Sequence, residues 1–595
     1  MKLALDVVLA LLGAFLFPRV TGDTDIFVSG GLLSVAAFGA LLALLRCSWK
    51  EKPSLRLVLT THGFGFLFAV MTAIGFTLER QGTVDYGAWQ LWCAISVYAH
   101  LYARILSLIA CGIQKAQPKL KKSVPVVDFI VGKWYIVLPA LLICWLPCYL
   151  AMYPGNFVYD ATKEYNQLQN GWLQDLPMLH SVLITGLLRW SEETTGHVNT
   201  GIAIFTALQM ALLAGMYTHM LCKFRKLGAN GFVLLGALVY CALFPGVHIL
   251  VSSTVRDVLF AGLVTYSVFL LWLMGRDVKG FLGSWWKPIG PALIVVLAVL
   301  ARNNNAAKVM PWLLAAVALL LFFVGGKKGW KGALAFGVTA LCSFFVLSAL
   351  LTGICTDAKA PSRNASKALM TQSIARAYTL EGENWEAEEK LKMAGFFNLD
   401  KMKYVAESGD TTKGKLKLTS YEKEQEFTQF WLEMGKKYPA IYADAILLNT
   451  RAAWFPGAVM DGYQESKTAS YPKYDKCWFY VGDAIEEPGV LESKWPKLHD
   501  FYQDIALRIS YEKVPLVSLL FSTAFHFWLV LACLCVAVVT KARQLYLPLF
   551  VLVAYTLISM AVPIMLLRYF AALLLAFPFV LVAMLQPNIG KEDLL

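Results

Sequence analysis

Long apolar runs alternate with short polar segments along almost the whole chain. A helix needs about 17–25 mostly apolar residues to cross the roughly 30 Å hydrocarbon core of a bilayer. Fourteen runs approach that length: 3–19, 27–46, 57–77, 88–112, 134–152, 200–221, 231–250, 256–275, 287–301, 307–325, 332–353, 515–540, 545–566 and 567–586. The pattern predicts an all-α polytopic membrane protein with about fourteen transmembrane helices.

The first run, MKLALDVVLALLGAFLFPRV, has the outline of a secretory signal peptide. It carries Asp6 inside its apolar part, however, and it lacks an A-x-A cleavage site. We therefore expect this run to be retained as the first span.

Lysine and arginine gather in alternate loops, always after an even-numbered run. These residues are Arg46, Lys50, Lys52 and Arg56, then Lys115, Lys119, Lys121 and Lys122, then Lys223, Arg225 and Lys226, then Arg276, Lys279 and Lys287, then Lys327, Lys328 and Lys331, and finally Lys541 and Arg543. Short cytoplasmic loops carry an excess of basic residues. The alternation therefore predicts a multi-pass protein of the cell membrane with both termini in the cytoplasm.

Two long polar segments fall on the opposite, extracytoplasmic side in this topology. The segment 354–512 contains helical patterns at 384–397 and 420–455, with Pro439 at the first turn of a second helix. We expect three parts: an N-terminal transmembrane domain over 1–353, a mainly helical extracytoplasmic domain over 354–512, and C-terminal transmembrane helices over 513–595. The first part includes the outer loop 153–199, whose run 178–190 has amphipathic helical spacing.

Composition agrees with the membrane assignment and argues against a nucleic-acid partner. The 595 residues are 58% hydrophobic and 16% charged, against about 25% charged in soluble domains. The net charge of +13 lies mainly in the loops assigned to the cytoplasm. Membrane lipids, and no nucleic acid, are the expected environment.

The twelve cysteines show no metal-ligand spacing, and apolar runs contain Cys144, Cys148, Cys241, Cys342, Cys533 and Cys535, among others. Cys355 and Cys477 are the two that fall in the segment 354–512. Disulfides form in oxidising compartments. We predict that these two cysteines form a disulfide across the outer domain.

Ionisable and amide side chains stand where several runs meet the outer face. They are Asp160 after the fifth run, Arg256 and Asp257 at the start of the eighth, Arg302 and Asn303 after the ninth, and Arg568 and Tyr569 at the start of the last. Any one of them could be a helix cap or a snorkelling anchor. Together they predict a functional site, because ionisable groups are rarely placed at membrane depth without a role.

Arginines and a carboxylate at this depth suit a lipid-linked phosphate substrate. Arginine binds phosphate through paired hydrogen bonds, and a carboxylate can deprotonate an acceptor hydroxyl. Asp160 with Asp257 could also hold a divalent cation, but no His, Asp or Glu spacing demands one. We expect a metal-independent site with no required cofactor.

The order of short motifs resembles the membrane-embedded GT-C superfamily of glycosyltransferases, and more narrowly a poorly characterised bacterial branch of it. The resemblance covers roughly residues 130–570. Its motifs are PG-x-x-x-x-D (Pro154, Gly155, Asp160), Q…G…H (Gln167, Gly171, His180), [KR]D (Arg256, Asp257), R-N-N (Arg302, Asn303), Q-x-x-x-R (Gln372, Arg376), P-x-x-Y-x-x-A…W-x-P (Pro439, Tyr442, Ala445, Trp454, Pro456) and R-Y (Arg568, Tyr569).

The resemblance implies a GT-C-like fold and an outward-facing active site. It implies transfer of a sugar from a polyprenyl-phosphate donor to a cell-envelope glycan, lipid or protein acceptor, with Asp160 as general base. The implied residues are Asp160 and Asp257 for catalysis, Arg302, Arg568, Arg256 and His180 for the donor phosphate, and Asn303, Gln372, Arg376 and Tyr569 for substrate binding. Leu176–Pro177 replaces an expected His-Pro, which weakens the role of His180, otherwise read as a packing histidine. Lys163 and Glu164 read as a local surface pair.

Two other classes of function stay open. A transporter or flippase of a lipid-linked glycan would be expected to show an internal repeat and helices broken near the membrane centre. A structural or assembly protein would use the outer domain as a binding module and would not need Asp160.

Overall fold

The computed structural model describes residues 2–21, 32–47, 53–121, 124–158, 160–172, 176–302, 306–355, 364, 367–402, 404–406, 409–458, 485–506, 510–514, 516–562 and 564–589. Within these ranges every extended regular element is a helix, and β-pairing is limited to two isolated bridges. The all-α class predicted from the sequence is confirmed. Several of the helices are apolar and long enough for a multi-pass membrane protein.

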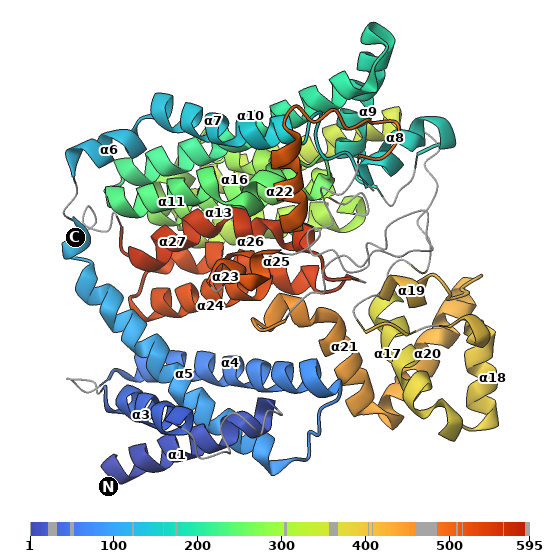
Figure 1. Cartoon of the computed structure of the whole chain (residues 1–595). Helices are drawn as coiled ribbons and strands as arrows, with labels where there is room; N and C mark the ends of the chain where they lie inside the picture. Colours follow the sequence, from blue (N-terminus) through green and yellow to red (C-terminus); the bar gives the residue numbers. More distant parts are fainter. Residues whose placement is uncertain are drawn as a thin grey trace.

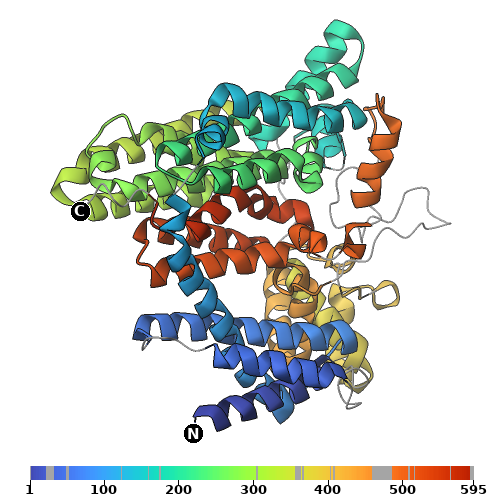
Figure 2. The same ribbon diagram turned by 60° about the vertical axis from the view of Figure 1, so that its left-hand side comes forward.

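The helices form three groups that lie side by side (Figures 1 and 2). The first group is α1 (Lys2–Thr21), α3 (Leu32–Arg46), α4 (Leu55–Gln81) and α5 (Trp89–Ala116). The second, on the far side, is α6 (Pro125–Gly132), α7 (Trp134–Ala151), α9 (Met178–Thr195), α10 (Val198–Lys226), α11 (Gly231–Leu243), α12 (Pro245–Val251), α13 (Arg256–Arg276), α14 (Val278–Leu282), α15 (Ile289–Arg302) and α16 (Ala306–Ile354).

The C-terminal helices lie between these two groups in both views (Figures 1 and 2). They are α23 (Val517–Phe521), α24 (Thr523–Val539), α25 (Tyr546–Ser559), α26 (Ala571–Leu575) and α27 (Phe577–Leu585). Their apolar side chains join those of α7, α10, α11 and α13 in one large buried core. The C-terminal helices thereby pack against helices that precede and follow the outer loop 153–199.

The expected number of fourteen spans is wrong for the described residues. Six helices are long and apolar enough to cross a membrane: α4, α5, α7, α10, α13 and the Gly329–Ile354 part of α16. Two bent pairs raise the number to eight. Other predicted runs form shorter helices such as α15 and α25, each with 14 residues. A helix of that length rises only about 21 Å, less than the hydrocarbon thickness.

The two bent pairs replace single predicted spans. The pair α11 and α12 bends by 56° at the Phe244–Pro245 step, where proline cannot continue the hydrogen-bonding ladder. The second pair joins residues Leu567–Leu575 to α27 and bends by 42°. It begins with the 3-10 turn η8 (Leu567–Phe570), which carries Arg568.

The described part of the segment after α16 is mainly helical, as predicted. It contains α17 (Ala368–Glu381), α18 (Ala387–Phe396), α19 (Gly409–Lys413), α20 (Tyr421–Lys437), α21 (Pro439–Trp454) and α22 (Pro496–Ala506). Pro439 begins α21, which confirms the two-helix interpretation of 420–455. Side chains of α17, α18 and α20 share a separate apolar core. The second half of α21 packs instead on α4 and α5.

Two predictions fall on residues outside the described ranges. Asn303 and Cys477 are both outside them. Cys355, at the end of α16, is buried. The proposed disulfide and the role of Asn303 therefore stay predictions, as do the domain boundaries.

Candidate functional site

The chain after α7 is held against the turn before α13, and this contact sets the position of Asp160. Backbone hydrogen bonds join Asn156 N to Ser252 O (3.0 Å) and Thr254 N to Asn156 O (3.1 Å). Gly155 precedes them with φ +136°, and a Cβ there would lie 2.2 Å from Thr206 Oγ1. A residue with a side chain is disfavoured at such a position. These two hydrogen bonds hold the start of the outer loop, just before Asp160, beside the turn that leads into Arg256.

Two helices begin at the site, each with one acidic residue in its first turn. Asp160 is the first residue of α8 (Asp160–Asn170), and Asp257 is the second residue of α13. A carboxylate in the first turn of a helix is stabilised by the partial positive charge of the free N–H groups. Helix geometry and the backbone pairing together bring these two predicted carboxylates to one place.

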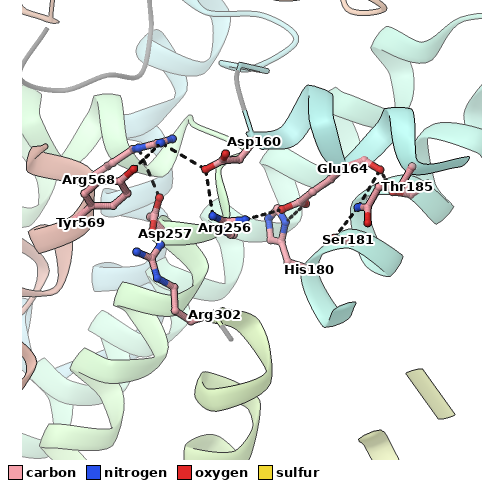
Figure 3. Close-up of polar contacts among 11 residues, drawn as sticks. Asp160, Glu164, His180, Ser181, Thr185, Arg256, Asp257, Arg302, Arg568 and Tyr569 are labelled. Atoms are coloured by element: carbon pink, nitrogen blue, oxygen red, sulfur yellow. Dashed lines mark hydrogen bonds and ion pairs between the residues drawn. The ribbon is translucent and has the colours of Figure 1, made fainter. Parts of the chain in front are cut away.

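Seven side chains form a continuous row of alternating charge, here called the charge chain (Figure 3). The row runs in the order His180, Glu164, Arg256, Asp160, Arg568, Asp257 and Arg302. It contains three carboxylates and three guanidinium groups, besides the histidine. The net charge of these seven side chains is therefore zero when His180 is neutral.

Asp160 lies between two arginines. Its Oδ2 is 3.4 Å from Arg256 Nη2 and 3.4 Å from Arg568 Nη2. The carboxylate is largely buried, at 12% side-chain exposure. Burial by itself would raise the pKa of this carboxyl, but the positive charges of Arg256 and Arg568, followed by Lys163 and Arg302, hold the pKa well below its usual range. Asp160 is thus an ionised and weakly basic carboxylate in the absence of a ligand.

Arg568 and Arg302 meet at the second carboxylate. Arg568 Nε lies 3.6 Å from Asp257 Oδ2, and Arg302 pairs with Asp257 through its Oδ1. The ring of Tyr569 lies between the two arginines, with its centroid 5.0 Å from Arg568 Cζ and 5.2 Å from Arg302 Cζ. Guanidinium groups over an aromatic face gain a further stabilising interaction. Predicted residues from α13, α15 and η8 therefore converge here.

Glu164 belongs to the site, and the interpretation of Lys163 and Glu164 as a surface pair is wrong for Glu164. Its side chain is 0% exposed, and its Oε2 lies 2.5 Å from His180 Nδ1. Its Oε1 lies 3.9 Å from Arg256 Nη1. Positions four apart on a helix share a face, so Glu164 lies on the face of α8 that carries Asp160. That spacing was the signal in the sequence that could have identified it.

Neighbouring polar groups fix the helix that carries Glu164. Thr185 Oγ1 donates to the Glu164 carbonyl (3.3 Å), and Gln167 Nε2 donates to Ser181 Oγ (3.2 Å). The ring of His180 stacks edge-on against Phe205 of α10, with the centroids 5.4 Å apart. Helix α8 is therefore packed against α9.

Two nitrogens of the Arg256 guanidinium lack a hydrogen bond within the described part of the chain. Its Nε and Nη1 are buried and make no hydrogen bond to the described residues, although Nη1 lies within ion-pair distance of Glu164. Buried donors without acceptors carry a free-energy cost, and an anionic ligand would remove it. The arrangement can accept an anion such as a phosphate next to an ionised carboxylate.

Gln372 and Arg376, predicted to bind substrate, do not contact the charge chain. Gln372 lies on α17 and donates to the carbonyl of Val405. Arg376 donates to Gly82 O (2.5 Å) and to Tyr404 OH (3.2 Å). Both have local partners, and Arg376 joins the outer helices to the turn between α4 and α5. A part in substrate binding stays a prediction for both.

A metal centre was not expected, and the geometry offers no cluster for one in the described ranges. No group of three or more His, Cys, Asp or Glu side chains lies close enough there to hold an ion. The two carboxylates discussed for a cation, Asp160 and Asp257, each face arginines. Metal independence stays a prediction.

Fold and site together define an all-helical, multi-pass membrane protein with a buried, charge-balanced polar site. Residues 175–592 match the model of a family described as a family of unknown function (DUF6020), and the chain belongs to that family. No curated protein and no solved structure matches the chain. Five of the seven residues of the charge chain lie within the matched region, whereas Asp160 and Glu164 precede it.

Proposed function

We propose that the protein is a GT-C-type glycosyltransferase that moves a sugar from a polyprenyl-phosphate donor to a cell-envelope glycan, lipid or protein acceptor. The observation that carries the proposal is the position of Asp160, buried between Arg256 and Arg568 and joined through Arg568 to Asp257 and Arg302. A base and a cationic clamp for a phosphate leaving group are the two parts that such a reaction needs.

The reaction breaks one bond and forms one bond at the sugar. The acceptor hydroxyl oxygen attacks the anomeric carbon while the bond from that carbon to the phosphate oxygen breaks, and its electron pair stays on the phosphate. The hydroxyl proton passes to Asp160. The leaving polyprenyl phosphate gains one negative charge, and arginine side chains stabilise such a developing charge.

The low pKa of Asp160 fits this sequence of events. Arg256 and Arg568 hold the pKa of the empty site down. A bound phosphate would share these guanidinium groups and bring its own negative charge near Asp160, and both effects favour protonation of a carboxylate. Asp160 would then become a stronger base only when the donor is present.

The expected topology completes the proposal. The site is placed on the extracytoplasmic face with both termini in the cytoplasm, on the basis of the basic loops in the sequence.

Ligand-induced stabilisation tests the proposal. The purified full chain is heated in detergent with a panel of polyprenyl-phosphate sugars and, as a control, with the matching polyprenols that lack phosphate. A ligand that binds the folded protein raises the melting temperature. We expect stabilisation by at least one phosphorylated member and none by the polyprenols. Stabilisation by no member of a broad panel would overturn the proposal.

A transporter of lipid-linked glycans is the second candidate, because two helix pairs are bent by 56° and 42°. Broken helices are typical of transporter sites. One of these pairs begins with the turn that carries Arg568. Sugar transfer in detergent, where no membrane separates two compartments, would favour the enzyme over the transporter.

A further inference from the structure

Two loops on the side assigned to the cytoplasm carry an excess of positive charge. The segments 276–287 and 326–331 contain six basic residues and one acidic residue, Asp277. The first segment follows the candidate span α13 and contains α14, and the second includes the start of the candidate span Gly329–Ile354 of α16. Because two membrane-spanning helices end here, the loops lie at the boundary between the bilayer and water.

The two loops pack directly on each other. Leu282 of α14 is fully buried, and a Cβ at Gly332 of α16 would lie 2.4 Å from Leu282 Cα. Glycine permits such a close approach of two backbones. The rings of Trp285 and Trp330 meet edge to face, with their centroids 5.4 Å apart. The exposed lysines that these contacts place on adjoining loops are here called the basic patch: Lys279, Lys287, Lys327 and Lys331.

The charge of the basic patch is not neutralised within the described part of the chain. None of its four lysines forms an ion pair with a carboxylate of the described residues. Asp277, the one acidic residue of the two loops, accepts a hydrogen bond from Gly280 N (2.8 Å). The basic loop after α10 differs, since Arg225 there pairs with Asp128 at 2.6 Å. The basic patch can therefore attract an anion from outside the protein.

Three exposed tryptophans surround the basic patch. Trp285 is 41% exposed, Trp286 is 80% exposed and Trp330 is 42% exposed. Indole rings are enriched where a membrane meets water, because the ring is apolar and its N–H can reach a polar partner. The lysines beside these rings therefore lie at the level of the lipid headgroups.

An exposed apolar stripe on α16 begins next to the basic patch. Trp330, Leu334 and Val338 follow one another at four-residue spacing, and positions four apart share one face of a helix. Leu334 is 48% exposed and Val338 is 51% exposed. An acyl chain that lies along this stripe would bring its headgroup to Lys331. A soluble anion would make no use of the stripe, so the arrangement favours a phospholipid.

We propose that the basic patch binds the headgroup of an anionic phospholipid, with an acyl chain along Trp330, Leu334 and Val338. The inference is independent of the proposed function, because it involves neither the charge chain nor a sugar donor. A phosphatidylglycerol headgroup carries one net negative charge, whereas a phosphatidylcholine headgroup carries none. Each basic residue near an anionic lipid surface strengthens binding about fivefold, so the four lysines should select the charged lipid.

Native mass spectrometry of the full chain in detergent tests the inference, because it counts the lipid molecules bound to each chain. Dioleoyl phosphatidylglycerol is the probe, dioleoyl phosphatidylcholine is the chain-matched neutral lipid, and glycerol 1-phosphate is the headgroup without chains. We expect phosphatidylglycerol to bind at concentrations where the other two compounds stay unbound. Raising the salt concentration from about 0.1 M to about 0.5 M should weaken this binding, because salt screens interactions between exposed charges.

Paired variants separate the basic patch from the general charge of this side. Lys287→Gln combined with Lys331→Gln removes one lysine from each loop, and the affinity for phosphatidylglycerol should fall about 10- to 30-fold. The matched control combines Lys115→Gln with Lys119→Gln, at two exposed lysines of another loop on the same side, and should keep the wild-type affinity. Lys287→Arg combined with Lys331→Arg retains the charge and should also keep the affinity.

Three results would overturn the inference. Equal binding of phosphatidylglycerol and phosphatidylcholine by the wild-type protein would show that the anionic headgroup is not recognised. An equal loss of affinity in the matched control would show that the overall charge of this side attracts the lipid. Binding of glycerol 1-phosphate as tightly as the lipid would show a site for soluble anions. None of these results concerns the charge chain, so the proposed function is tested separately.

Discussion

The guanidinium of Arg568 lies 3.4 Å from the carboxylate of Asp160, although the two residues come from distant parts of the chain. Arg568 precedes α26, and Asp160 begins α8 in the outer loop. Their contact shows how the C-terminal helices complete a site that begins after α7. The same arginine also faces Asp257, so it is the central cation of the charge chain.

Replacing that cation should weaken donor binding. Arg568→Ala and Arg302→Ala each remove a charge-assisted partner, and we expect the affinity for a polyprenyl-phosphate donor to fall about 10- to 100-fold. Arg189→Ala is the matched control, because Arg189 is 65% exposed and pairs only with its neighbour Glu193 among the described residues. Calorimetry with the donor measures the effect. Unchanged affinity in both variants would mean that these arginines only anchor helix ends.

Acid stability should report the ion pairs of Asp160. The pKa of this carboxyl is held well below its usual range by the nearby arginines, against the opposing effect of burial. A carboxyl whose folded pKa is depressed stabilises the protein above its unfolded pKa, about 3.9, and loses that contribution as the pH falls towards the folded pKa. Melting temperatures of wild type and Asp160→Asn should therefore differ by a constant amount above about pH 5, and the difference should begin to narrow below about pH 4 and keep narrowing as the pH falls towards the folded pKa. A gap that already closes at neutral pH would contradict this charge state.

The stability of the protein should depend on a polar contact between the outer helices and the turn between α4 and α5. Asp444 of α21 is buried and accepts from Val84 N (3.2 Å) and Tyr86 OH (2.8 Å). Tyr86→Phe removes one of these bonds and leaves the other, so we expect a loss of about 1–3 kcal/mol in the free energy of unfolding. Donor affinity should not change. Thermal melting and calorimetry on the same samples measure both quantities, and a selective loss of affinity would place this contact in substrate binding.

Topology can be tested with a natural cysteine. Cys47 is exposed at the end of α3, in the first loop assigned to the cytoplasm. In right-side-out vesicles a membrane-impermeant maleimide should label Cys47 only after the membrane is opened, with Cys47→Ser as the blank. A reporter at Glu193→Cys, where Glu193 is 62% exposed on α9, should be labelled in sealed vesicles. The reverse labelling pattern would show that the topology is the opposite of the one proposed and that the site lies on the cytoplasmic face.

Most of the charge chain could be predicted from the sequence, because its charged residues stand where apolar runs begin or end. Arg256, Arg302 and Arg568 stand at the ends of such runs, and the structure brings all three to the carboxylates. Glu164 was missed because α8 is mainly polar, and its burial depends on packing against α9, which composition does not reveal. Only its spacing of four from Asp160 indicated a shared face.

Helix lengths were less predictable than helix positions. The run 231–250 reads as one span but bends at Pro245, and the run 287–301 gives a helix too short to cross a bilayer alone. Apolar side chains are favourably buried against protein and against lipid alike. A hydropathy pattern therefore predicts a span both for a helix that crosses the membrane and for a short helix buried within the protein. Tertiary packing decides between them, as in the core that joins the C-terminal helices to α13.

Sugar transfer by the wild-type protein and by Asp160→Asn is the measurement that tests the proposed function most directly. The two proteins are incubated with a labelled polyprenyl-phosphate sugar that stabilises the wild type and with a cell-envelope extract as the source of acceptor. Asparagine keeps the shape of the side chain but cannot accept the hydroxyl proton, so we expect turnover to fall about 10²- to 10⁴-fold while the variant stays folded and still binds the donor. Transfer by the variant within a few-fold of the wild type would contradict the assignment of Asp160 as the base.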